Sequence, residues 1–170
     1  MSIMIYPDKF DDCNLHYEPA VQNNDADDSK FSRIVYSTKH ISLNGICIAL
    51  DFVGVRCEQH YNKMFVSFDP GLTDNHCIVS QLHLIEHKII NKYVDSVLEG
   101  TRQCIYSLTD QLNRGSIKIY AKDNDHDNDH DHDKEKEKDI MSHKQNMMIQ
   151  IYGVWETNDE CGITYKFVKW

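Results

Sequence analysis

Residues 147–170 read MMIQIYGVWETNDECGITYKFVKW and contain two runs rich in β-branched and aromatic residues. These runs, Met147–Trp155 and Gly162–Trp170, flank the polar stretch Glu156–Cys161. Two such runs on either side of a short polar stretch are typical of a β-hairpin, here with a loop of about six residues. The C-terminal part of the chain is therefore predicted to form a pair of antiparallel strands.

Alternation along these strands separates an apolar face from a polar one, because successive side chains of a strand point to opposite sides. The same alternation occurs in Ser116–Ala121, which predicts a third strand. The residues expected to face the core are Ile117, Ile119, Ile149, Ile151, Ile163 and Phe167. The residues expected on the opposite face are Lys118, Tyr120, Gln150, Tyr152, Thr164 and Lys166.

Further strands are predicted upstream, at Phe31–Lys39, Ile46–Cys57, Lys63–Phe68 and Arg102–Leu108. The second of these is apolar on both faces, which indicates a central strand. Before the last of them, apolar residues recur every three or four positions from about Ile78 to Leu98, which predicts one amphipathic helix. Gly100 follows as a natural stop signal.

This order of elements predicts a mainly β (α+β) domain, because helices are too few for a doubly wound fold. Two architectures fit the pattern. One is a small OB-like barrel, a five-stranded Greek key with one helix. The other is a curled antiparallel sheet with one packed helix at about 78–98.

The net charge of −9 is distributed unevenly along the 170 residues. Segment 122–139 holds nine acidic residues and four lysines, and segment 7–28 holds seven acidic residues and one lysine. The remainder holds 13 basic and 11 acidic residues. We therefore expect an acidic N-terminal arm at 1–30 outside the core, and one β-rich domain at 31–170 that is nearly neutral in charge.

The acidic tract interrupts this domain between two predicted strands. Asp123–Asp133 reads DNDHDNDHDHD, and Lys134–Lys138 reads KEKEK. A segment without aliphatic or aromatic residues cannot bury enough apolar surface to order itself. We predict a disordered hairpin insert at 122–145, and loose metal binding by its alternating Asp and His residues is the open alternative.

Several protein classes are excluded at this stage. No apolar run approaches the roughly 18 residues that a membrane span needs, and the N-terminus shows no secretory signal pattern. The six cysteines contain no C-x-x-C pair, which favours reduced thiols in an intracellular compartment rather than disulfides or a zinc knuckle. The oligomeric state stays open.

The string His83–His87 has the H-x-x-E-H spacing of inverted zinc proteases. Those enzymes need a third protein ligand and a larger scaffold, so an ordinary amphipathic helix is the favoured interpretation. G-x-S-x-G, Walker and G-x-G-x-x-G motifs are absent from the sequence. The chain is therefore predicted to be no enzyme, with no catalytic residue, metal or cofactor.

The remaining signal is the mixture of aromatic and basic residues on the polar sheet face. Stacking rings and cations are what single-stranded nucleic-acid binding requires. The residues predicted to bind it are Lys118, Tyr120, Tyr152 and Lys166, with Arg56, Lys63 and Arg114 as electrostatic support. An ordinary solvated sheet face is the alternative interpretation.

Residues 115–120 (GSIKIY), 149–157 (IQIYGVWET) and 162–167 (GITYKF) resemble small proteins of large nucleocytoplasmic DNA viruses. Some of those proteins look like OB-fold single-stranded DNA-binding proteins. The resemblance implies support of viral replication or recombination, in the host cytoplasm or nucleus. This chain ends in Phe167-Val168-Lys169-Trp170 instead of an acidic tail. A structural or interaction protein, such as a minor virion component, is the alternative, and DNA versus RNA stays open.

Overall fold

The computed structural model describes residues 3–22, 28–60, 63–98, 100–120, 140–141 and 146–169. Its helices are α1 (Thr73–Ser96), α2 (Ser107–Asn113) and the short 3-10 turns η1 (Pro7–Lys9) and η2 (Asp12–Asn14). The N-terminal strands are β1 (Leu15–Tyr17), β2 (Val21–Gln22), β3 (Lys30–Ser37), β4 (Ser42–Asn44), β5 (Ile46–Leu50), β6 (Arg56–His60) and β7 (Lys63–Ser67). The later strands are β8 (Gln103–Ile105), β9 (Ser116–Tyr120), β10 (Ile140–Met141), β11 (Met147–Glu156) and β12 (Glu160–Lys169).

The described strands form one curved sheet in the order β1-β3-β11-β12-β9-β7-β6-β10. Strand β5 continues the line of β3 along β11, and β8 runs beside the start of β12. Most pairs are antiparallel, but β12 is parallel to both β8 and β9. Within the described residues no pairing joins β1 to β10, so the sheet is open and the predicted OB-like barrel is not formed. The predicted mainly β class with a packed helix is confirmed.

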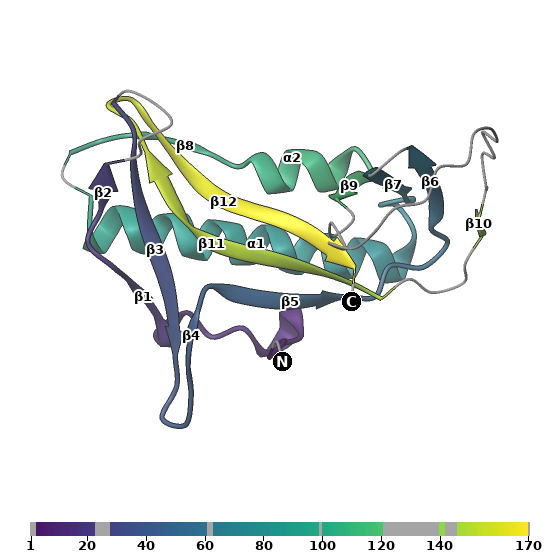
Figure 1. Ribbon diagram of the computed structural model, residues 1–170, viewed down its shortest axis with the longest axis horizontal. Helices are drawn as coiled ribbons and strands as arrows, with labels where there is room; N and C mark the ends of the chain where they lie inside the picture. The colour runs from purple at the N-terminus through teal and green to yellow at the C-terminus, as the bar shows by residue number, and fades with distance from the viewer. Residues whose placement is uncertain are drawn as a thin grey trace, which may run out of the picture.

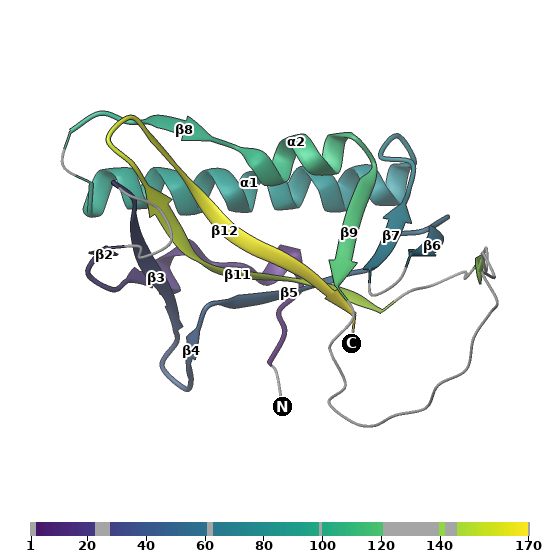
Figure 2. The same ribbon diagram turned by 45° about the horizontal axis from the view of Figure 1, so that its top comes forward.

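The long helix α1 crosses one face of the sheet, and α2 lies beside it at the sheet edge (Figures 1 and 2). In Figure 1 the strands pass in front of α1, so the view is onto the face away from the helix. Among the described residues, no helix combines the length and the apolar character that crossing a membrane requires.

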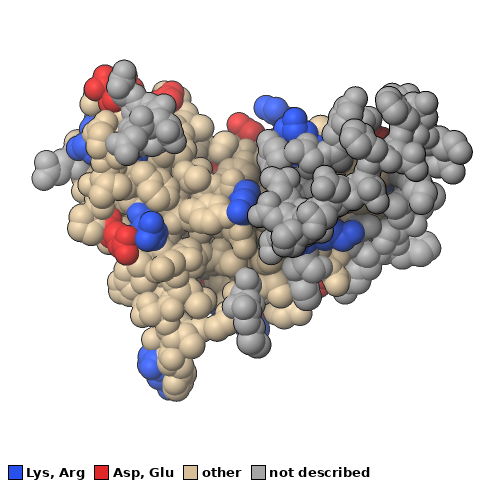
Figure 3. Space-filling view, in the orientation of Figure 1, with Lys and Arg blue, Asp and Glu red and all other residues tan. Residues whose placement is uncertain are grey.

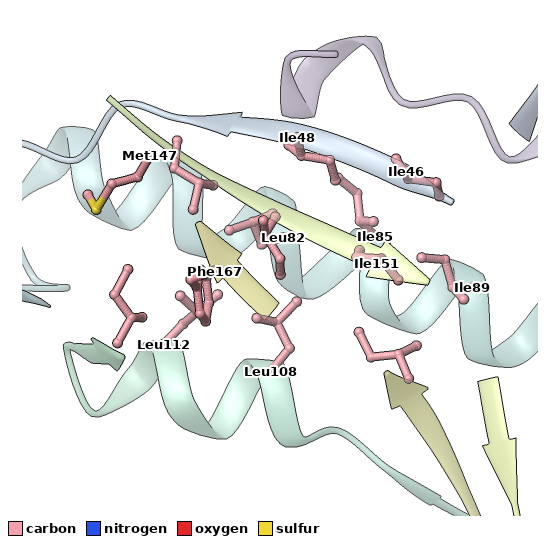
Figure 4. Packing of buried hydrophobic residues seen from close by; sticks show 14 of the residues in the cluster. Ile46, Ile48, Leu82, Ile85, Ile89, Leu108, Leu112, Met147, Ile151 and Phe167 are labelled. Carbon is pink, nitrogen blue, oxygen red and sulfur yellow. The ribbon is translucent and has the colours of Figure 1, made fainter. Parts of the chain in front are cut away.

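The core lies between the sheet and the two helices (Figure 4). All six residues predicted from alternation to face it are at most 3% exposed. The helix supplies Leu82, Ile85, Ile89 and Tyr93, as its periodicity predicted. Burying one such side chain stabilises the fold by roughly 1.5–3 kcal/mol, so this layer holds the sheet and α1 together.

The C-terminal hairpin is confirmed, with a tighter turn than predicted. Glu156 and Cys161, which were expected in the loop, pair with each other, and the turn is confined to residues 157–159. Thr157 closes it, because its Oγ1 accepts the backbone N–H groups of Asp159 and Glu160. A bulge at Tyr152 shifts the register between Ile151 and Gly153.

Helix α1 starts at Thr73 rather than about Ile78, and it ends at Ser96. Its first turn is polar, so hydrophobic periodicity does not reveal it. Asn75 is fully buried there, and its Oδ1 accepts the backbone N–H of Val53 at 2.8 Å. Its Nδ2 donates to the carbonyl oxygens of Val53 and Asp69. This tertiary contact anchors the helix start to the loop before β6.

Two predicted strands are corrected by the structure. Ile46–Cys57 is not one strand, because β5 ends at Leu50 and β6 begins at Arg56. Gly54 lies between them with φ +65°, a left-handed conformation that favours glycine. Only Gln103–Ile105 of the strand predicted at 102–108 is extended, and α2 begins at Ser107.

The N-terminal segment is packed against the body, so its predicted place outside the core is wrong. Leu15 is fully buried, and β1 pairs with β3. The Tyr17 hydroxyl donates to the carbonyl of Ile89 at 2.6 Å, and Asp12 pairs with Lys88 at 2.8 Å. The predicted insert at 122–145 lies outside the described residues except for β10, which pairs with β6.

Candidate nucleic-acid interface

The sheet face away from α1, called the outer face below, carries a row of side chains that crosses six strands. Gln150 of β11 pairs with Cys47 of β5 on one side and with Lys166 of β12 on the other. Farther along, Phe65 of β7 pairs with Lys118 of β9 and with Glu58 of β6. We call this set the central row: Cys47, Gln150, Lys166, Lys118, Phe65 and Glu58.

The two halves of the central row meet at the parallel pair β12–β9. Phe167 and Ile119 are register partners there, and both are buried on the core side. The residue before each one therefore points to the outer face, which sets Lys166 and Lys118 side by side. Neighbouring strands lie about 4.8 Å apart. Two cations from distant parts of the sequence are therefore adjacent on the outer face.

An aromatic ring lies next to each of these lysines. The Lys166 Nζ is 5.2 Å from the centre of the Tyr152 ring, within the range of a cation–π contact. The Tyr152 hydroxyl donates to the Gln150 Oε1 at 2.7 Å, which holds the ring along the face. The Lys118 Nζ is 6.0 Å from the centre of the Phe65 ring, which is 37% exposed.

The other predicted binding residues flank the central row. Arg56 is exposed on β6, one outward position before Glu58. Lys63 is exposed on β7, and its register partner is Tyr120 of β9. Arg114 is exposed directly after α2. The structure thus brings Lys118, Lys166 and Tyr152 together and places Arg56, Lys63 and Arg114 on flanking elements, while of Tyr120 it describes the backbone position alone.

Sequence reasoning missed three aromatic residues of this face. Phe65 alternates with buried Val66 and shares its side with Lys63, so the strand pattern contained the signal. Phe31 and Trp155 are register partners beyond the Tyr152 bulge. Gly153 makes room for the Phe31 ring, because a Cβ there would lie 2.5 Å from it. Gly162 makes room for the Trp155 ring, which a Cβ there would approach to 2.9 Å. Only the pairing of β3 with β11 reveals that Phe31 and Trp155 are neighbours.

The part of the outer face that is visible in Figure 3 carries few charged side chains. Figure 3 looks onto this face, and blue Lys and Arg atoms are spaced over it between broad tan areas. Red Asp and Glu atoms lie mainly toward its edges. Arg33, also on this face, is 3.9 Å from the Glu18 carboxylate, and two such exposed side chains interact weakly.

The H-x-x-E-H string has a structural role in this protein. Glu86 is fully buried, and its carboxylate accepts the backbone N–H groups of Leu108 and Thr109 at 3.0 and 2.8 Å. It also accepts the Thr109 hydroxyl at 2.6 Å. Glu86 therefore caps the N-terminus of α2 from the neighbouring helix. Within the described ranges, no group of three His, Cys, Asp or Glu residues could hold a metal ion.

The two histidines of the string form a ring stack with Tyr106, the residue before α2. The ring centre of His87 lies 4.4 Å from that of His83 and 3.8 Å from that of Tyr106. Burial lowers the pKa of His87 below its ordinary value, and the nearby His83 lowers it further, while Glu86 opposes both. The folded protein therefore favours neutral His87.

This lowered pKa predicts a loss of stability in mild acid. Below about pH 6.5, the ordinary value, the unfolded chain binds a proton at this position more readily than the folded chain. His87→Gln is expected to show a smaller fall in Tm between about pH 7.5 and pH 5 than the parent. Thermal unfolding at both pH values measures this, with His76→Gln at the exposed start of α1 as control. An unchanged fall in His87→Gln would refute the prediction.

All six cysteines lie in the described part of the chain and are free thiols. Burial raises the pKa of Cys161 to about 12, and the adjacent Cys104 thiol contributes to the rise. Burial also raises the pKa of Cys47 in the central row. Thiols with raised pKa values are poor nucleophiles at neutral pH.

A comparison of the chain with protein-family models found no match. Comparisons with curated proteins and with solved structures found no match either.

Proposed function

We propose that this chain is a non-enzymatic single-stranded nucleic-acid-binding protein that uses its outer face. The observation that carries the proposal is the central row, in which Lys166 and Lys118 lie side by side between the rings of Tyr152 and Phe65. Cations that follow a backbone, next to rings on which bases stack, are the two requirements of sequence-tolerant binding to single strands.

The shape of this face favours single strands over duplexes. Reading a duplex usually needs a helix or a two-stranded ribbon that enters the major groove. The long helix α1 instead packs on the opposite face of the sheet (Figure 2). An open sheet with rings lying along it offers its surface to bases that are already unstacked. Each stacked base contributes about 1–3 kcal/mol.

The proposed biological setting is viral replication or recombination, with DNA as the first ligand to test. Six free thiols suit the reducing compartment in which such work takes place. The N-terminal segment contributes a carboxylate to the outer face, that of Glu18 beside Arg33. Some of its other acidic residues are matched by cations, as Asp12 is by Lys88 and Asp8 by Lys9.

The direct test is a titration with fluorescent oligo-dT at rising salt. Phosphate contacts release counterions, so the logarithm of the affinity is expected to fall linearly with the logarithm of salt concentration. A duplex of equal length is the matched control and is expected to bind more weakly. Absence of binding at micromolar protein in about 50 mM salt would refute the proposal and favour a structural or protein-binding role.

A further inference from the structure

A pocket of about 500 Å³ lies beside the central row, where α2 fills the space next to β9. The lining residues that matter here are Phe65, Ser107, Asp110, Gln111, Arg114 and Lys118. A smaller hollow of about 330 Å³ adjoins it along β7 and shares Phe65 and Ser116. The pocket is therefore continuous with the proposed binding face through two of its residues, Phe65 and Lys118.

We propose that this pocket holds one nucleotide of the bound strand and prefers a base that carries an exocyclic amino group. The inference rests on the proposed function and adds a selective position to an otherwise sequence-tolerant face. The pocket volume lies within the roughly 300–1,000 Å³ of small-molecule sites. Its two cations suit the phosphate of a nucleotide. Its exposed ring, carboxylate and amide suit the base.

The phosphate is bound by Arg114 and Lys118, which both line the pocket. The N-terminal amides of α2 cannot take this role, because Glu86 already occupies those of Leu108 and Thr109. The guanidinium of arginine binds phosphate through two parallel hydrogen bonds. Two cations against one carboxylate, that of Asp110, leave the pocket net positive.

The base is recognised by the remaining side chains. Phe65 supplies the ring against which the base lies. Gln111 is held in place, because its Oε1 accepts the Tyr165 hydroxyl at 2.8 Å, which leaves its amide N–H groups to donate to a base edge. Asp110 can only accept when ionised, so it selects a base that donates, as cytosine does through its amino group. Thymine has no exocyclic amino group, and its one donor on this edge is the ring N3–H, which lies at a different position from the amino group of cytosine.

The experiment compares oligo-dC with oligo-dT of equal length, for the parent and for Asp110→Ala. The parent is expected to bind oligo-dC about tenfold more tightly, since one good base contact discriminates by roughly 5- to 150-fold. Asp110→Ala is expected to lose most of this preference while it still binds oligo-dT. Asp95→Ala removes an exposed carboxylate of α1 that does not line the pocket, and it is expected to keep the preference.

The outcomes separate the pocket from the binding face. Equal affinities of the parent for oligo-dC and oligo-dT would overturn the pocket assignment and leave the proposed function standing. The same holds if the preference survives in Asp110→Ala. Failure of the parent to bind either oligonucleotide would overturn both. Circular dichroism and Tm establish that Asp110→Ala is folded, as expected for a substitution at an exposed position.

Discussion

The double variant Lys118→Glu/Lys166→Glu is expected to bind oligo-dT at least about 100-fold more weakly than the parent at moderate salt. Each lysine that neutralises a phosphate of a single strand contributes roughly 0.7 to the slope of log affinity against log salt. Loss of both lysines therefore makes the salt dependence shallower, because the magnitude of the slope falls by about 1.4. Reversal of the two charges also makes the centre of the outer face repel phosphate groups, because these two side chains are neighbours across β12–β9.

The matched control is Lys9→Glu/Lys39→Glu, which makes the same change in net charge at exposed positions away from the central row. Charges separated by more than the Debye length, about 10 Å at 0.1 M salt, interact little. The control is therefore expected to stay close to the parent in affinity. Equal losses in both double variants would mean that only net charge matters, and that the central row is not the binding site.

The substitution Glu86→Gln is expected to lower the free energy of unfolding by about 3 kcal/mol, a large effect for one atom-for-atom replacement. The buried carboxylate accepts three hydrogen bonds from Leu108 and Thr109. An amide at this position turns a donor group toward donors, which leaves buried polar groups unsatisfied. The capping of α2 is then lost at a helix end that has no side-chain cap of its own.

Urea unfolding followed by circular dichroism measures this loss. Asp110→Asn is the control, because it neutralises an exposed carboxylate in the first turn of the same helix. Its expected cost is below about 1 kcal/mol, the usual size of a helix-dipole effect. If Glu86→Gln unfolds at the same urea concentration as the parent, Glu86 does not hold α2. If Glu86→Gln is as stable as the parent and the parent also binds zinc, the interpretation of His83–His87 as a metal site is favoured instead.

The cap also connects stability to the proposed binding site. Gln111 and Arg114 belong to α2 or follow it directly, and both line the pocket beside Phe65. A helix of seven residues has little stability of its own. The contact from α1 therefore sets where these two side chains stand.

Local pattern was sufficient to predict the class of fold and the sides of its strands. Ile149 and Ile151 face the core, and Gln150 and Lys166 face outward, because alternation is a property of the extended backbone itself. The hairpin and the buried stripe of α1 were predicted for the same reason. Each depends only on residues that are close in the sequence, within one helix or two successive strands.

Long-range contacts decided the rest of the fold. Helix α2 was invisible to periodicity, because it needs Glu86, which lies about 20 residues earlier in the chain. The N-terminal segment reads as a polar arm, yet pairing of β1 with β3 buries Leu15. Whether the sheet closes into a barrel depends on which edge strands meet, and no local pattern records that.

The candidate site shows the same division. The sequence by itself determined that Lys118, Tyr152 and Lys166 point away from the core. Only the tertiary structure decided that they are neighbours, because β9 and β12 are far apart in sequence and meet in parallel through Phe167 and Ile119. It also decided that α2 stands beside them and completes a pocket. Side-chain direction follows from the backbone's period of two, whereas adjacency of strands follows from the packing of the whole chain.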